Sequence, residues 1–245
     1  MFIHYRSQGF ILKKENLSES DQLFTIYTED FGKLEILGKA IRKIKSKLRS
    51  GADIFYLSDI EFIQGKTHKT LTDAIVIEKF ENLRKHLKRL QIAYKIAEVF
   101  DELVKGQEKD ENLWKLILEI FNGLNTRSLL TVHYLLIYYY FFWNLISVLG
   151  YHPELYKCPF CQKNLVSENL YFSQREGGVL CNQCFQKLKH GKKIDQETIK
   201  IIRILLKRDW QISKRLKVTP DNLKSLKTIS DYFLLFLRKS IVSSF

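Results

Sequence analysis

The chain holds all of its cysteines in two C-x-x-C pairs, Cys158-Pro159-Phe160-Cys161 and Cys181-Asn182-Gln183-Cys184. The 19 residues between the pairs lie within the spacing that is typical of four-cysteine zinc sites. Each pair can turn its sulfurs toward one point, and four thiolates in a tetrahedron suit Zn²⁺. Two disulfides are the alternative, but they need an oxidising compartment and the N-terminus shows no secretory signal. We therefore predict a zinc ion bound by Cys158, Cys161, Cys181 and Cys184.

The four ligands also indicate what the metal does. A catalytic zinc keeps an open position for water, whereas a site of four thiolates is closed and structural. The sequence has no G-x-x-x-x-G-K-S/T, G-x-G-x-x-G or H-E-x-x-H motif either. These observations argue against an enzyme, although they leave that class open.

Basic residues are concentrated in the last third of the chain. The net charge of the 245 residues is +13, and residues 158–245 contribute +10 of it, with 17 Lys and Arg against 7 Asp and Glu. Such an excess implies a polyanionic partner, which can be a nucleic acid, an acidic protein tail or a membrane surface. With 45% apolar residues, the chain can bury the core of one large domain or of two smaller ones.

Residues 1–80 have the pattern of a small β domain. Short segments rich in apolar and β-branched residues alternate with polar breaks, at residues 5–13, 22–28, 33–38, 54–64 and 70–77. Five strands with a longer irregular stretch after the third match the OB-type barrel, a frequent binder of oligonucleotides.

The irregular stretch between the third and fourth strands is strongly basic. It carries six cations and no acid: Lys39, Arg42, Lys43, Lys45, Lys47 and Arg49. A charge run is often only a solvated loop, but a basic loop beside a small barrel is also how single-strand binders follow a phosphate backbone. We favour the second interpretation and predict that these residues bind nucleic acid.

From Phe80 onward the apolar residues follow a helical period. We expect one long helix up to Gly106, a second that Asp110 caps, and a third over residues 128–150, which contain no charged residue. The third is long enough to cross a membrane, but its His, Asn and Ser and its central tyrosines favour the buried centre of a helical bundle. After the cysteines, we expect a helix from Asp195 to about Trp210 and another that opens at Pro220.

These elements predict an α+β fold with two domains. An OB-type barrel occupies residues 1–80, and a helical domain occupies residues 81–245 with the zinc finger inserted at about 151–190. A second candidate basic site lies on the helix after the finger, where Lys200, Arg203 and Lys207 share one face. Lys214, Arg215 and Lys217 follow directly. We expect this site to hold a second strand or an acidic protein tail, and the alternative is a helix face whose lysines only meet water.

The order of barrel, basic loop, helices and four-cysteine finger resembles the RecO family of bacterial recombination mediators. Glu19-Ser20-Asp21, Thr28 and Gly32-Lys33 are similar to the family's E-x-D…T-x-x-x-G-K run. The segment from Lys39 to Ser46 resembles its K-G-x-R-(R/K)-x-K-S motif, with Ala40 where the family usually has glycine. Leu149-Gly150-Tyr151 and Gly177-Gly178-Val179-Leu180 are similar to the sequence around the family's finger.

This resemblance implies a function beyond what the residues alone indicate. Members of that family are not enzymes; they bind single- and double-stranded DNA, anneal complementary strands, and help to load recombinase onto DNA coated by single-stranded DNA-binding protein. The implied partners are DNA, the acidic C-terminal tail of that protein, and RecR, and the implied location is the bacterial cytoplasm at the nucleoid. No membrane is expected. The alternative is an RNA-binding protein with an OB fold and a zinc knuckle, because the residues themselves do not distinguish DNA from RNA.

Overall fold

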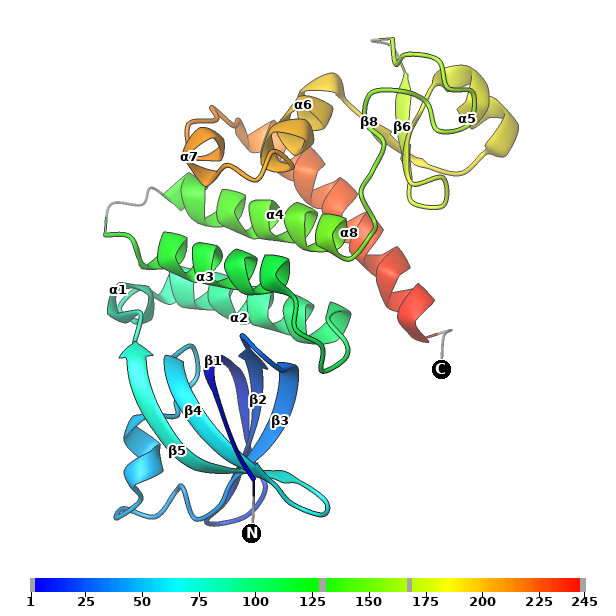
Figure 1. The fold of residues 1–245 in the computed structure, drawn as a ribbon. Coiled ribbons are helices and arrows are strands. Elements are labelled where there is room, and N and C mark those ends of the chain that lie inside the picture. Colours follow the sequence, from blue (N-terminus) through cyan, green and yellow to red (C-terminus); the bar gives the residue numbers. More distant parts are fainter. Residues whose placement is uncertain (1–2, 128–130, 167–168, 243–245) are drawn as a thin grey trace. The chain divides into compact units, whose positions relative to one another are not determined.

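Five N-terminal strands close into a barrel in the computed structural model, which describes residues 3–127, 131–166 and 169–242 (Figure 1). The strands are β1 (His4–Asn16), β2 (Gln22–Thr28), β3 (Gly32–Gly38), β4 (Leu57–Gln64) and β5 (Lys69–Glu78). The barrel order is β1-β2-β3-β5-β4, with β3 and β5 parallel and the other pairs antiparallel. The OB-type barrel of the sequence prediction is confirmed, and so is the α+β class.

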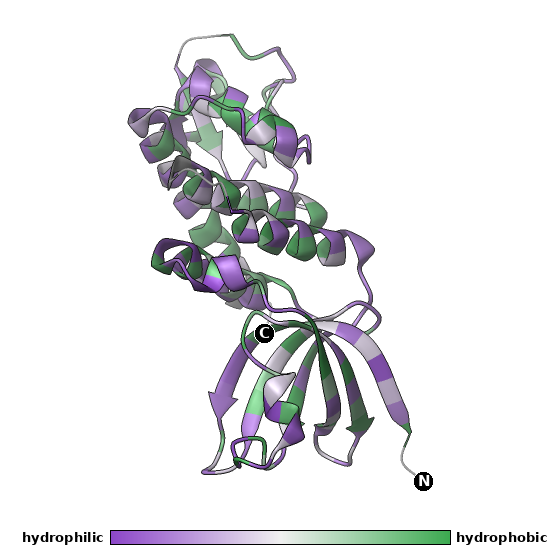
Figure 2. Cartoon of the chain, turned by 90° about the vertical axis from the view of Figure 1, so that its left-hand side faces the viewer, coloured by the Kyte–Doolittle hydropathy of each residue, from purple (hydrophilic) through white to green (hydrophobic). Residues whose placement is uncertain are grey.

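The first strand is long because it pairs twice. Its first half pairs with β4 and its second half with β2, and a register shift between Ile11 and Lys13 marks a bulge. An extra residue of this kind bends a strand and so helps to close a barrel. The strands alternate hydrophilic and hydrophobic residues along their length (Figure 2). The apolar side chains that fill the interior include Ile11, Phe24, Ile36 and Ile60.

Three helices complete the first compact unit, which covers residues 1–128. They are α1 (Glu81–Arg84), α2 (Leu87–Leu103) and α3 (Glu111–Asn125), and α2 and α3 lie side by side at one end of the barrel (Figure 1). Asp110 caps α3 as predicted, since its carboxylate accepts hydrogen bonds from the amides of Asn112 and Leu113 at 2.8 and 3.0 Å.

The prediction of a single long helix from Phe80 was wrong. The left-handed backbone of Phe80 precedes α1, and the chain breaks after Arg84 because His86 has an extended backbone, so α1 and α2 are separate. Leu87, whose spacing from Phe80 and Leu83 places it on the apolar face of the helix predicted from the sequence, is 71% exposed. Arg89 is buried instead, where its guanidinium donates to the carbonyls of Leu124 and Thr126 at the end of α3.

Aromatic packing explains why these helices belong to the barrel unit. The ring centroids of Phe10 in β1 and Phe121 in α3 are 4.2 Å apart, and those of Tyr27 in β2 and Phe100 in α2 are 4.8 Å apart. The predicted domain boundary at residues 80–81 therefore marks the end of the strands, while the compact unit continues to residue 128.

The second compact unit, residues 129–245, is built around α4 (Thr131–Val148). Every residue from Leu136 to Ile146 is buried, as expected for a central helix, while the predicted start at Ser128 lies outside the described residues. No helix within the described part of the chain combines the length and apolarity that a membrane crossing requires. The surrounding helices are α6 (Gln196–Leu205), α7 (Trp210–Ser213) and α8 (Pro220–Val242).

The helices after the finger begin where the sequence predicts but do not all end there. Asp195 caps α6 by accepting the Thr198 amide at 2.7 Å, and α8 opens at Pro220. The first of these helices ends at Leu205 rather than near Trp210, since Arg208 has a left-handed backbone and Asp209 caps the separate α7. The finger itself adds β6 (Leu170–Ser173), β7 (Gly178–Leu180), α5 (Asn182–Leu188) and β8 (Lys192–Ile194).

Candidate metal centre and nucleic-acid interface

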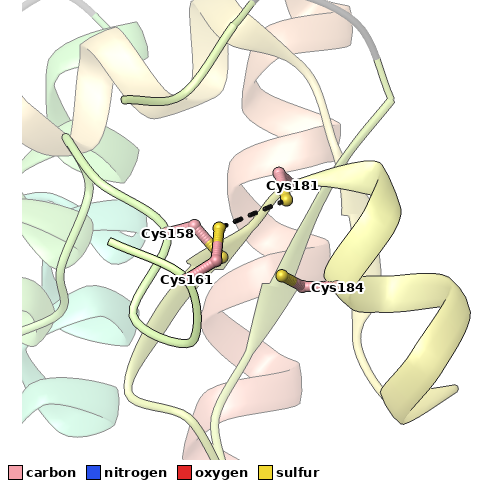
Figure 3. A group of neighbouring side chains, drawn as sticks. All are labelled: Cys158, Cys161, Cys181 and Cys184. Atoms are coloured by element: carbon pink, nitrogen blue, oxygen red, sulfur yellow. Dashed lines mark hydrogen bonds between the residues drawn. The ribbon is translucent and has the colours of Figure 1, made fainter. Parts of the chain in front are cut away.

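The four cysteines meet at one point. Their sulfur atoms all lie within 4.8 Å of one another, and the sulfurs of Cys161 and Cys181 are 3.8 Å apart (Figure 3). Four sulfurs at about 2.3 Å from a central zinc ion would be separated by about 3.8 Å along each edge of the tetrahedron. The observed arrangement therefore has the dimensions of a four-thiolate metal site.

Two local structures aim the sulfurs. In the first pair, Gln162 adopts a left-handed backbone (φ 61°), and its amide donates to the Cys158 carbonyl at 2.8 Å, which closes a tight knuckle. In the second pair, Cys181 ends the extended segment after β7 and Cys184 lies in α5. The approach to the site depends on Gly178, because a Cβ atom there would overlap the carbonyl oxygen of Glu154.

The electrostatics of the thiols favour a cation among them. Burial opposes ionisation of Cys158, but the backbone amides of Cys161, Cys181 and Phe160 outweigh it and lower its pKa to about 7. Burial raises the pKa of Cys184, and the three neighbouring sulfurs raise it further. Four thiolates this close repel one another unless a positive ion lies between them, and a zinc dication supplies that charge.

The site is also closed in the way a structural metal site is. Cys158 and Cys184 are buried with Leu180, and Leu165, Tyr171 and Leu188 pack around them. The ring of Tyr171 stacks on Phe185 with a centroid separation of 3.5 Å. The four donors and their apolar shell thus fit a metal ion that would tie β6 and β7 to α5 and the first knuckle.

The basic loop forms the second candidate site. It runs between β3 and β4 as a series of turns with one short 3₁₀ helix, η1 (Lys47–Ser50). All six of its cations are exposed, and within the described residues none of the six forms an ion pair: Lys39, Arg42, Lys43, Lys45, Lys47 and Arg49. The loop is therefore an exposed cluster of positive charge, in which the guanidinium of Arg42 also donates a hydrogen bond to the Ser18 carbonyl at 2.8 Å.

Apolar anchors hold this loop in one shape. Ile41 is buried in the barrel core, Leu48 packs against the same core, and Ala52 closes it from the far end of the loop. The amide of Ala40 donates to Asp21 at 2.8 Å, which together with the Ser20 hydroxyl lowers the pKa of that carboxyl. Ala40 has a left-handed backbone (φ 52°), the conformation that glycine adopts without strain.

A pocket of about 370 Å³ opens beside the loop. It is lined by Lys14, Gln22, Ile41, Arg42, Arg49, Ala52 and Asp53. Asp53 pairs with Lys14 and with Arg84, and these cations with the Ile54 amide overcome the effect of burial and lower its pKa. Because that carboxylate already has two cationic partners, the charges of Arg42 and Arg49 stay available to an anion.

Comparison with known proteins identifies the family. The family model for the N-terminal part of recombination protein O matches residues 1–80, and the model for its C-terminal part matches residues 84–237. The chain belongs to the RecO family. Relatives named DNA repair protein RecO include that of Caldanaerobacter subterraneus, 30% identical over 218 residues (87% of this chain and 84% of the relative). Those of Alkaliphilus metalliredigens (28% over 233 residues, 95% and 93%) and Dehalococcoides mccartyi (27% over 223 residues, 91% and 86%) are similar too.

In this RecO-family chain, the cations of the second candidate basic site differ in exposure and in their partners. Lys200 is paired with Glu197 at 2.6 Å. Arg203 is half-buried, donates to the Leu155 carbonyl and lies over the ring of Tyr156. Lys214 is half-buried, whereas Lys207, Arg215 and Lys217 are exposed and have no ion-pair partner among the residues described. The charge available to a partner therefore lies mainly at these last three residues.

Sequence reasoning missed the residues that complete the pocket. Lys14, Gln22 and Asp53 come from β1, β2 and the chain before β4, and no motif links them. Their separation in sequence hides the site, because only the pairing of β1 with β2 and with β4 brings them together. The RecO motif around Lys39 marks one side of the pocket and nothing marks the other.

Proposed function

We propose that this chain binds DNA through the basic loop, anneals complementary single strands, and helps to load recombinase onto DNA coated by single-stranded DNA-binding protein. Membership of the RecO family supports the connection with DNA repair. The observation that carries the proposal is the exposed loop of residues 39–49, which has six cations. Two of them, Arg42 and Arg49, line a pocket large enough for part of a nucleotide.

The chemistry of the loop suits phosphates. Lysine and arginine side chains on a turn reach outward without a fixed orientation toward base edges, so their contacts carry little sequence information. Each phosphate that they neutralise releases condensed counterions, which makes binding strong at low salt and weak at high salt. The proposed role is one of binding and alignment, in which the protein forms and breaks no covalent bond.

Annealing needs two strands on one molecule, and a second basic surface meets that need. We assign it to the region that contains Lys200, Arg203, Lys207, Lys214, Arg215 and Lys217, with exposed Lys207, Arg215 and Lys217 as its principal charges. It would hold the second strand or the acidic tail of the single-stranded DNA-binding protein. Two sites on one chain raise the effective concentration of one strand near the other. RecR is the further partner proposed.

The metal has a structural part in this proposal. A zinc ion held by Cys158, Cys161, Cys181 and Cys184 would fix the finger, while the helices behind it pack through Phe172, Trp143 and Phe233. Phe172 lies in β6, Trp143 in α4 and Phe233 in α8. Elemental analysis of protein purified without chelator should find one zinc per chain, and a chain that folds fully without metal would contradict this assignment.

The test of the DNA site is a charge reversal with a matched control. Arg42, Lys43 and Lys45 are changed to Glu together, and binding of single-stranded DNA is measured over a range of salt concentrations. We expect weaker binding and a slope of log K against log salt reduced by about 0.7 for each lost phosphate contact. The control reverses Lys66, Lys88 and Lys105, which are also exposed and form no ion pair among the described residues. Equal effects of the two variants, or no effect of the first, would refute the loop site.

A further inference from the structure

A tyrosine ring is held in an unusual way at the entrance to the finger. The guanidinium of Arg203 in α6 lies 4.2 Å from the ring centroid of Tyr156, while Tyr156 remains 60% exposed. A cation over one face of an aromatic ring is a favourable contact, since the ring face carries partial negative charge. Because Arg203 lies over one face of the ring, the exposed surface of Tyr156 is available on the other face and at the ring edge.

The surrounding contacts fix this pair in place. The side chain of Glu154 accepts hydrogen bonds from the amides of Tyr156 and Lys157, at 2.7 and 3.1 Å, and the Tyr156 carbonyl accepts the Leu165 amide at 3.1 Å. Arg203 also donates to the carbonyl of Leu155, so the same guanidinium holds both the backbone and the ring. An exposed aromatic ring that is fixed by these contacts adds little to the packing of the core, and it can contact a bound partner.

Further cations occur close to Tyr156 and Arg203 in the sequence. Lys157 is the next residue and is exposed, and Lys207 follows Arg203 by four residues. Lys200 precedes Arg203 by three residues, but its charge is balanced by Glu197. An aromatic platform among cations is the arrangement by which proteins bind single-stranded nucleic acid without sequence preference, because every base has a face that can stack.

We infer that the open face of Tyr156 stacks against an unpaired base of a bound single strand, with Arg203 as the residue that positions the ring. The inference rests on the proposed DNA-binding function and adds a base contact to a surface otherwise made of phosphate contacts. It also changes the role of Arg203, which supports an aromatic ring instead of meeting a phosphate. Stacked bases lie unpaired and in line, so a strand held here is ready to pair with another.

The first experiment separates stacking from charge. The full-length zinc-loaded protein and its Tyr156→Ala variant are titrated with a thymidine oligonucleotide and with an abasic oligonucleotide of equal phosphate count. We expect the affinity of the variant for the base-bearing strand to fall about tenfold. Its affinity for the abasic strand should stay the same as that of wild type. Tyr156→Phe keeps the ring and should behave as wild type. Equal losses for the two strands, or no loss for either, would overturn the inference.

A second readout does not depend on the alanine variant. Tyr156→Trp places an exposed indole at the platform, while Trp114 and Trp143 are buried and Trp210 is half-buried. The base-bearing strand should quench this fluorescence and the abasic strand should not. Adding Arg203→Lys keeps the charge but removes the planar guanidinium, so it should reduce the quenching and leave abasic binding unchanged.

The outcomes distinguish this inference from the proposed function. If wild-type protein binds neither oligonucleotide, both the inference and the DNA-binding proposal fail. If it binds both strands equally and the indole is not quenched, the platform fails alone. The platform is supported if Tyr156→Ala loses affinity only for the base-bearing strand and if that strand quenches the fluorescence of Tyr156→Trp.

Discussion

The basic loop at residues 39–49 and the basic segment at residues 200–217 look alike in sequence and differ in structure. The loop carries six cations and the segment seven, yet only the loop exposes all of its cations without an ion pair among the described residues. In the segment, Glu197 pairs with Lys200, and Arg203 is used inside the fold. Charge counted along a chain is therefore an upper limit to the charge that a partner meets.

The cause of this difference is secondary structure. A run of turns needs only a few anchors, here Ile41 and Leu48, and the cations of the loop stay exposed. A helix buries one face and brings residues three apart together, so Glu197 meets Lys200. The long side chain of Arg203 extends to the Leu155 carbonyl and the Tyr156 ring, which precede the first cysteine pair.

Loss of the metal should produce the largest effect and should separate the two regions. Cys181→Ser removes one of four ligands, and structural zinc contributes on the order of 10 kcal/mol to folding small zinc domains. We expect bound zinc to fall from one per chain to near zero and the finger to unfold, while the barrel keeps its fold and its salt-dependent DNA binding. Gln183→Ser, an exposed change within the same C-x-x-C pair, is the control. Retention of zinc and of the finger's hydrogen-exchange protection in Cys181→Ser would contradict the assignment.

The end of the loop provides the next test. Gly51 lies against β5, and a Cβ atom there would overlap the carbonyl oxygen of Ala74, which belongs to the rigid backbone. Gly51→Ala should destabilise the first unit by about 1–3 kcal/mol and weaken loop-dependent DNA binding, as seen in urea unfolding and in titration. Ser50→Ala, at the exposed neighbouring position, should change little. An unchanged unfolding midpoint for Gly51→Ala would show that the loop is not seated as described.

Single cations should then differ according to their partners. Lys43→Ala and Lys207→Ala each remove an exposed charge without an ion-pair partner among the described residues, and each should reduce the salt slope by about 0.7. Lys200→Ala removes a charge that Glu197 already balances, so its effect should be smaller. Titrations of single-stranded DNA at several salt concentrations measure this ranking. If Lys200→Ala has the largest effect of the three, the comparison between the regions fails.

The smallest expected effect concerns the turn that begins the loop. Ala40 has φ 52°, a conformation that costs a residue with a Cβ atom about 1–2 kcal/mol. Ala40→Gly should therefore raise the unfolding free energy by up to about 1 kcal/mol. Ala52→Gly makes the same change at a buried position without a positive φ, and should destabilise instead. Calorimetry that shows the same sign for both variants would contradict the strained turn.

The sequence predicted the features that depend on local patterns. The spacing of the cysteines, the strands of the barrel, the Asp110 and Asp195 caps and the apolar central helix all follow from neighbouring residues, and the structure confirms them. Features made by distant residues could not be predicted in this way. The break between α1 and α2 lies at the extended backbone of His86, and the burial of Arg89 follows from carbonyls 35 and more residues away.

The candidate sites show the same division. The cations of the loop were recognisable from their run in the sequence, whereas Lys14, Gln22 and Asp53 join them only through strand pairing. The contact between Arg203 and Tyr156 links two residues on either side of the finger, and each alone has an ordinary sequence context.

Annealing of complementary oligonucleotides tests the central claim, that one molecule brings two strands together through two basic regions. The rate is followed by energy transfer between labelled strands, with and without single-stranded DNA-binding protein, for wild type, for the Arg42, Lys43 and Lys45 reversal, and for a Lys207, Arg215 and Lys217 reversal. The account predicts that wild type accelerates annealing and that each reversal alone removes most of the acceleration, because each leaves only one strand held. Annealing at the wild-type rate by either variant, with its fold and zinc content intact, would contradict the account.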